Sequence, residues 1–142
     1  VYPNNAQSWM VAGPFNLQGM QAAELRFWLW LNTQPQADGA CRAVSIDGVD
    51  FYGTCTSGNT FGWIERVTDL RNVPSLGNVV GSPRVWIALA FRSDGATTYP
   101  QGAYVDNVIL NQCQRNCPGV SSAAAAEPLV GVIEYPIVMS IP

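Results

Sequence analysis

Apolar and polar residues alternate with a period of two along most of this chain, in short runs bounded by Gly, Pro, Asn and Asp. This pattern is typical of β-strands joined by turns, because successive side chains of a strand point to opposite faces. Signals for helices are nearly absent. The alternation predicts strands at about residues 8–17, 24–32, 41–47, 49–55, 61–69, 84–92 and 102–111.

Two of these runs, ELRFWLWLN and RVWIALAFR, carry large apolar side chains on both faces of the expected strand. Such a strand is covered on both sides and therefore lies centrally in its sheet. Residues 70–83, LRNVPSLGNVVGSP, are expected to form a long loop with at most one helical turn. Seven short strands with frequent turns predict an all-β fold, an antiparallel jelly roll or β-sandwich.

The stretch PLVGVIEYPIVMSIP, at 128–142, is a further apolar run that follows the last strand of this expected sandwich. It is too short to span a bilayer, which takes about 20 apolar residues, and Glu134 and Pro136 interrupt it. Its β-branched content predicts a C-terminal extension strand, and its prolines restrict that strand to a sheet edge or to interrupted pieces. The side chains expected to form this assembly strand are Leu129, Val130, Val132, Ile133, Tyr135, Ile137, Val138 and Ile141.

The chain is therefore expected to have three parts: a sandwich domain at 1–117, a linker at 118–127 and the terminal strand at 128–142. The linker, PGVSSAAAAE, consists of small and polar residues. A strand that only closes its own sheet needs a connection of about 4–6 residues. The longer linker favours a strand that reaches a neighbouring copy.

The four cysteines are predicted to form two disulfides. Asp47-Gly48 is a strong hairpin signal, and a three-residue turn over 47–49 places Cys41 opposite Cys55, near bridging range. Cys113 and Cys117 then close a short loop. A zinc site is the alternative, but it requires closely spaced cysteine pairs that 41 and 55 do not supply. Disulfides indicate an oxidising, extracellular compartment. No secretion signal is present, so Val1 is expected to begin a processed, secreted chain.

Composition argues against several classes of function. The net charge is −3, with seven arginines, no lysine and no basic cluster, which disfavours nucleic acid as a partner. The absence of histidine removes the commonest general base and transition-metal ligand. The spare carboxylates in strand-like context are Glu24, Glu65 and Asp69, and no acid–base pair can be placed among them. We therefore expect a protein that is not an enzyme.

Two weaker patterns suggest ligand sites. Asp38, Asp94 and Asp106 are candidate oxygen ligands for a structural calcium ion, the only cofactor that the sequence suggests. The same three residues also suit turns and a strand-end cap, so both interpretations stay open.

Tyr52, Tyr99 and Tyr104 lie near expected loops, where their rings are candidates for stacking on a sugar. The five tryptophans are more typical of a core, because most of them fall on central strands.

Six segments occur in a familiar order over residues 8–112: SWMVAGPFNL, AELRFWLW, SIDGVDFYG, GWIERVTDL, RVWIALAFRSDG and QGAYVDNVIL. The series resembles jelly-roll modules of secreted bacterial proteins, often found beside immune-inhibitor-type metallopeptidases, and more distantly MAM-like domains. The resemblance implies a non-catalytic module, and some similar modules bind glycans or a structural calcium. Those modules usually have one or two strands ahead of the segment that matches Ser8 to Leu17. The resemblance therefore predicts an open sheet edge there, which the terminal strand would fill.

Three functions follow as alternatives. The first is an extracellular structural subunit that self-assembles into a filament or tube by donating its C-terminal strand to a neighbour, so that its partners are copies of itself. The second is a glycan-binding or cell-surface adhesion module of a larger secreted protein. The third is a domain whose terminal strand folds back with no further role.

Overall fold

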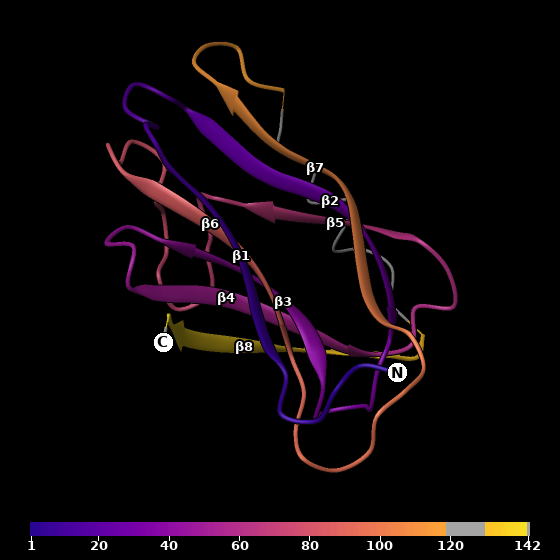
Figure 1. Cartoon of the computed structure of the whole chain (residues 1–142). Helices are drawn as coiled ribbons and strands as arrows, with labels where there is room; N and C mark the ends of the chain where they lie inside the picture. The colour runs from indigo at the N-terminus through magenta and orange to yellow at the C-terminus, as the bar shows by residue number, and fades with distance from the viewer. Residues whose placement is uncertain (119–129, 142) are drawn as a thin grey trace.

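The structure is a computed structural model that describes residues 1–118 and 130–141, and it consists of two antiparallel β-sheets packed face to face (Figure 1). One sheet has five strands in the order β1-β6-β3-β4-β8, and the other has three in the order β5-β2-β7. No helix occurs in the described part of the chain, so none there could cross a membrane. The strands are β1 (Gln7–Phe15), β2 (Ala22–Asn32), β3 (Gly39–Ser45), β4 (Asp50–Gly58), β5 (Ile64–Asp69), β6 (Val85–Arg92), β7 (Gly102–Cys113) and β8 (Val132–Ser140).

The main core lies between the sheets, as the alternation in the sequence predicts. Every second residue of β2 faces inward and is almost fully buried, from Leu25 to Leu31. Val85, Ile87 and Leu89 of β6 meet them from the five-stranded sheet. The long segment between β5 and β6 closes the core, because Leu70, Val73 and Val79 are buried in it. Both strands with apolar residues on two faces, β2 and β6, have a partner strand on each side.

The all-β sandwich predicted from the sequence is confirmed, and the seven predicted strands are present with ends shifted by no more than three residues. The terminal strand is also confirmed as β8. Of the expected linker at 118–127, only Pro118 lies within the described residues, and Leu129 lies outside them. Val130 belongs to a turn before β8, and Ile141 follows it.

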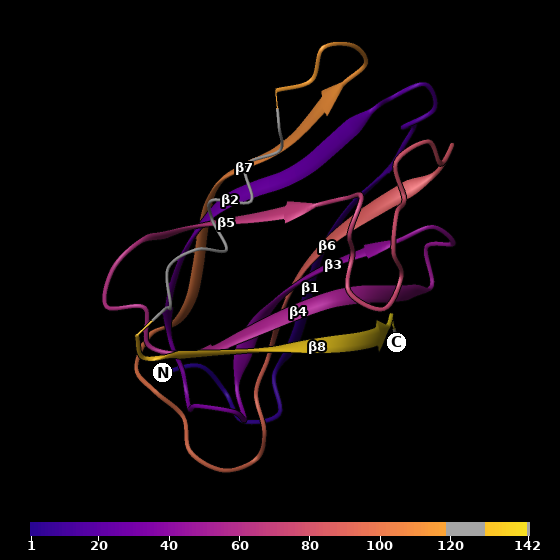
Figure 2. The ribbon, with the colours of Figure 1, turned by 180° about the vertical axis from the view of Figure 1, so that it is seen from behind.

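The predicted neighbour of the terminal strand is wrong. Instead of lying beside the segment from Ser8 to Leu17, β8 pairs with β4, from Asp50↔Ser140 to Gly58↔Val132. This is the edge of the five-stranded sheet opposite to β1, and both views show β8 lying beside β4 (Figures 1 and 2). β8 pairs with β4 because β4 and its neighbouring strands present buried positive charges and an apolar surface that match β8, as described below.

Both predicted disulfides are present. Cys41 and Cys55 lie opposite each other in the β3–β4 hairpin with their Cα atoms 3.9 Å apart, which is the register expected from the Asp47-Gly48 turn. Cys113 is bonded to Cys117 at the end of β7. Two disulfides indicate an oxidising compartment such as the extracellular space.

Mass mapping of a digest made without reductant tests this pairing. We expect one linked pair of peptides containing Cys41 and Cys55 and one containing Cys113 and Cys117. Because all four cysteines are disulfide-bonded and none has a free thiol, alkylation without reductant should label none of them. A peptide that joins Cys55 to Cys113 would contradict the register of the β3–β4 hairpin.

Candidate functional site: the slot for the C-terminal strand

β8 completes the five-stranded sheet along the whole length of β4. Its register with β4 has no interruption. At the two ends the amide of Asn59 donates to the carbonyl of Gly131 over 2.9 Å, and that of Ile141 donates to Val49 over 3.3 Å. Odd-numbered residues of β8 thus direct their backbone groups toward β4. Pro136, at an even position, has its nitrogen on the free edge, so its missing N–H costs the β4–β8 ladder nothing.

The strand begins at a position that requires glycine. Gly131 has a φ of 87°, in the region where other residues are strained. A Cβ there would also lie 2.5 Å from the ring of Phe61 and 2.8 Å from the carbonyl of Asn59. The close approach of Gly131 to these residues fixes where β8 enters the sheet.

The odd-numbered side chains of β8 build an apolar cluster on the outer face of the five-stranded sheet. Tyr135, Ile137 and Met139 pack there, and Trp9 reaches the same cluster from β1. Phe51 is fully buried although it points away from the main core, and its ring lies 5.7 Å from that of Trp9. Trp86 of β6 also packs against this cluster, and the remaining members are small residues and the first disulfide: Cys41, Ala43, Cys55, Ala88 and Ala90.

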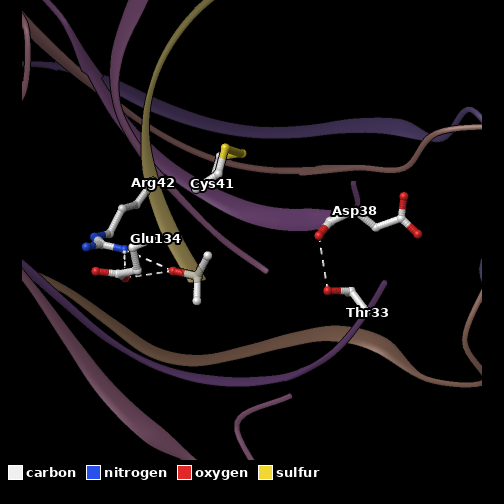
Figure 3. The surroundings of a disulfide bond; sticks show 7 residues. Thr33, Asp38, Cys41, Arg42 and Glu134 are labelled. Carbon is white, nitrogen blue, oxygen red and sulfur yellow. Dashed lines mark hydrogen bonds and ion pairs between the residues drawn. A yellow bond between two sulfur atoms is a disulfide. The ribbon is translucent and has the colours of Figure 1, made fainter. Parts of the chain in front are cut away.

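On the inner face, β8 contributes a single charge. The carboxylate of Glu134 pairs with Nη1 of Arg42 at 3.0 Å and with Nη2 of Arg66. It also accepts a hydrogen bond of 2.8 Å from the hydroxyl of Thr56, and Nε of Arg42 donates to Thr68 over 3.1 Å. Figure 3 shows the Arg42 guanidinium directed at Glu134, on the side of β3 opposite to the disulfide. One residue of β8 thus joins strands β3, β4 and β5.

The Glu134 carboxylate matters for stability because the two arginines that it pairs with are buried. The side chains of Arg42 and Arg66 are only 10% and 7% exposed, and a buried guanidinium is costly without a charged partner. Among the described residues, Glu134 is the one carboxylate that pairs with either arginine. We call the β4 edge, the outer cluster and these two arginines the β8 slot.

The pKa values show the same competition between burial and pairing. Burial of Glu134 acts to raise its pKa, but the charges of Arg42 and Arg66 and the hydrogen bonds from Arg42 and Thr56 outweigh burial. The net pKa of Glu134 therefore lies below its ordinary value. Burial lowers the pKa of Arg42, and the nearby charge of Glu134 opposes that shift.

The three candidate calcium ligands do not converge. Asp38 is fully buried, and its carboxylate accepts hydrogen bonds from the Tyr2 hydroxyl at 2.5 Å and the Asp94 amide at 2.8 Å. Asp106 lies on β7 in the other sheet, opposite Trp28. No group of three His, Cys, Asp or Glu suited to a metal occurs in residues 1–118 and 130–141. Asp38 and Asp94 instead tie the N-terminal segment to the end of β6.

The three candidate tyrosines are also separated. Tyr52 lies on β4 opposite Val138 and packs against the main core, because its side chain faces the other sheet. Tyr99 lies in the segment between β6 and β7. Only Tyr104 is a surface ring, 52% exposed on β7, with its centroid 5.7 Å from that of Trp30.

The spare carboxylates are all engaged in ion pairs. Glu24 and Glu65 both contact Arg26, at 3.1 and 2.6 Å, and Asp69 contacts Arg71 at 2.8 Å. The Arg26–Glu65 and Arg71–Asp69 pairs are partly exposed, where such interactions contribute little to stability, whereas the side chain of Glu24 is only 12% exposed.

The sequence pattern does not reveal the two arginines of the slot. Each occupies one position of an alternating strand, in ACRAVS and IERVT, where a charge usually marks the solvent face. The lone Glu134 in an apolar run was the available signal, because an acidic side chain that faces the interior of a sandwich needs a cationic partner. Comparison with family models, curated proteins and solved structures finds no match for this chain.

Replacing Glu134 with Gln should lower the free energy of unfolding by about 1–3 kcal/mol at pH 7, because it leaves two buried guanidinium groups without a carboxylate. Glu65→Gln, which breaks an exposed pair, is the matched control and should cost less than about 1 kcal/mol. Urea unfolding followed by tryptophan fluorescence measures both.

The cost of Glu134→Gln should also depend on pH. The folded-state pKa of Glu134 is lowered from an ordinary value of 4.5, so its contribution is complete above about pH 4.5 and is lost as the pH falls through the folded pKa. The difference between wild type and Glu134→Gln should shrink below about pH 4.5. A difference that stays constant down to pH 3 would contradict the pairing.

Proposed function

We propose that this chain is a non-catalytic extracellular structural subunit that assembles into a filament or tube by placing β8 in the β8 slot of a neighbouring copy. The observation that carries this proposal is how β8 is attached. Within its sheet it borders β4 alone, yet it supplies Glu134 and one side of the outer cluster. A strand with one neighbour and a matched slot suits exchange between copies.

The connection before β8 supports exchange. Residues 114–131 separate β7 from β8, and the described structure seats β8 in its own chain. A neighbour's β8 would make the same contacts with β4, Arg42 and Arg66, so exchange needs no new surface. Such an exchange of an identical element between copies is domain swapping.

The kind of contact sets the kind of assembly. Donor strand and slot are different surfaces, so the contact is heterologous and propagates into a filament or tube unless a rotation closes it into a ring. Backbone hydrogen bonds along β4 provide affinity, and the side chains on either face fix the register. Tyr135, Ile137 and Met139 are partly buried, so each contributes less than the roughly 1.5–3 kcal/mol of a fully buried apolar side chain, and the cost of ordering the strand is subtracted from that.

The fold and the disulfides also bear on the relatives of this protein and on its cellular location. A two-sheet sandwich with two disulfides supports a relationship to the jelly-roll modules of secreted bacterial proteins. We therefore propose that this chain is a secreted, cell-surface protein. The open edge expected at Ser8 to Leu17 is not where the terminal strand lies, so the slot beside β4 takes its place in the proposal.

A second candidate is a glycan-binding or adhesion module, and one observation favours it. Trp28 is 40% exposed and Tyr104 is 52% exposed on the outer face of the three-stranded sheet. Exposed apolar side chains that form a contiguous patch often mark a ligand-binding surface, and aromatic rings can stack on a sugar. Loss of polysaccharide binding in Trp28→Ala, with assembly unchanged, would favour this candidate.

Mixing two variants that each carry one added cysteine, beside the four native ones, tests exchange directly. Tyr52 and Val138 face each other across β4 and β8 in a non-hydrogen-bonded pair, the same kind of pair as Cys41–Cys55. A chain with Tyr52→Cys and a chain with Val138→Cys, mixed and oxidised, should form a covalent dimer, because only exchange brings the two positions together.

Trp28→Cys mixed with Val138→Cys is the control and should give no dimer, since Trp28 lies on the other sheet. The double variant, with both cysteines in one chain, should give covalent ladders on a non-reducing gel. Only intramolecular bonds in the double variant, together with no dimer in the mixture, would show that β8 stays in its own chain.

A further inference from the structure

Within residues 1–118 and 130–141, four strands border only one other strand and so have a free edge: β1 and β8 in the five-stranded sheet, and β5 and β7 in the three-stranded sheet. A free edge presents unpaired N–H and C=O groups to which another strand can pair. Natural proteins usually protect such edges with charges, prolines, bulges or short strands. The four edges differ in how much of this protection they carry.

Three of the edges carry such protection. β8 has Pro136 on its free side and a charge at Glu134. β5 is six residues long and contains Glu65, Arg66 and Asp69. β7 has an exposed Asp106 beside a register shift, and the next residue, Asn107, has a φ of 50°. None of these three strands offers an uninterrupted uncharged ladder.

The edge of β1 has such protection only at its C-terminal end. No charged side chain occurs between Val1 and Ala23, so the whole strand is uncharged. Met10 is 54% exposed and Val11 is 40% exposed. The proline of β1, Pro14, lies in the register shift between Ala12 and Phe15, at the end of the strand.

The direction of the free groups on β1 follows from its register with β6. The amide of Ser93 donates to the carbonyl of Ala6 over 2.9 Å, and the pairing continues in the same register as Gln7↔Arg92. Even-numbered residues thus direct their backbone groups toward β6. Gln7, Trp9 and Val11 direct theirs outward, so the free ladder covers most of the strand.

We propose that β1 is a second assembly surface, which pairs antiparallel with the β1 of another copy. Antiparallel pairing about a twofold axis sets the β1 edge against the same edge of the second copy, so no like charges meet. The free N–H groups of each strand then face the free C=O groups of the other. The free edges of β5, β7 and β8 would instead bring a charge, a bulge or Pro136 into the ladder. The β1 edge of a second copy is therefore the best-matched occupant.

The inner face of β1 adds an apolar contribution. Met10 and Ser8 line one side of a cavity of about 180 Å³ between the sheets, which Phe27, Leu29, Leu89 and Val105 also line. A strand added beside β1 would cover Met10 and shield this side of the cavity from water. Both the backbone and the apolar side chains of β1 then gain partners.

This surface goes beyond the proposed strand exchange and does not depend on it. β1 and β8 lie at opposite edges of one sheet, so both contacts can form on one molecule. Exchange of β8 would propagate a filament, and β1 pairing would join two subunits, or two filaments, through a continuous sheet.

A matched pair of proline variants tests the proposal in the full chain. Val11→Pro removes an outward N–H from β1, and Val138→Pro removes an outward N–H from the free edge of β8. Both residues are exposed valines whose N–H groups point away from their one neighbour. Sedimentation equilibrium and residue-resolved hydrogen exchange are measured over a range of concentrations, and thermal unfolding confirms that each variant folds.

We expect protection of the Gln7, Trp9 and Val11 amides to increase with concentration in the wild type and in Val138→Pro. Val11→Pro should weaken association through β1 at least tenfold. Met10→Lys keeps the backbone N–H but adds a charge to the edge, and it should weaken association as well. Exchange of β8 alone leaves the β1 amides unprotected, so this readout separates failure of one contact from failure of the other.

Three outcomes would overturn the proposal. The first is β1 amides whose protection does not change with concentration. The second is association through β1 that Val11→Pro and Val138→Pro weaken equally. The third is new protection on β1 accompanied by new protection on β5 or β7, which would make another strand the occupant.

Discussion

Two guanidinium groups buried between the sheets need a negative charge, and the last strand of the chain supplies it. Arg42 comes from the middle of one sheet and Arg66 from the edge of the other. Glu134 meets both, so one carboxylate links the two sheets on this side of the sandwich. Breaking a buried pair is far more costly than never having made it. The arginines thus make the rest of the fold depend on β8 being in its place.

The outer cluster reinforces this dependence from the other face. Small residues along β3, β4 and β6 let Trp9 lie across the sheet toward Phe51, while Met139 closes the cluster from β8. Removing β8 would expose Phe51 and the Cys41–Cys55 disulfide as well as the two arginines. The slot is thus polar on one side and apolar on the other, which fixes both the face and the register of the strand that fills it. Pro136 completes this arrangement, because it leaves the ladder to β4 intact and ends the sheet on the outside.

Much of the fold follows from local sequence signals. The alternation in β2 and β6 identified the strands that lie centrally in their sheets, although the outer face of β2 is exposed at Trp28. The Asp47-Gly48 turn fixed the register that joins Cys41 to Cys55. Both signals act over a few residues, so a single sequence contains them. The existence of β8 followed for the same reason, from a short apolar run with β-branched residues.

The position of β8 did not follow, because it depends on which strands become neighbours in space. Arg42 has the sequence pattern of a solvent-facing residue, and only the fold of the second sheet over β3 buries it. The preference of Glu134 for the β4 edge arises from that burial, which no local pattern shows. The separation of the calcium candidates has a similar origin, since Asp38 and Asp94 meet at one end of the sheet while Asp106 belongs to the other sheet.

A double-mutant cycle between Glu134 and Arg66 tests the central claim most directly, because it isolates their interaction from the other effects of each change. The free energies of unfolding of wild type, Glu134→Gln, Arg66→Met and the double variant are measured in urea at pH 7. We expect the two changes to be strongly non-additive, with a coupling energy of about 1–3 kcal/mol, so that Arg66→Met costs much less once Glu134 is gone. Additivity within about 0.3 kcal/mol would contradict the claim that this carboxylate anchors β8 in the sandwich.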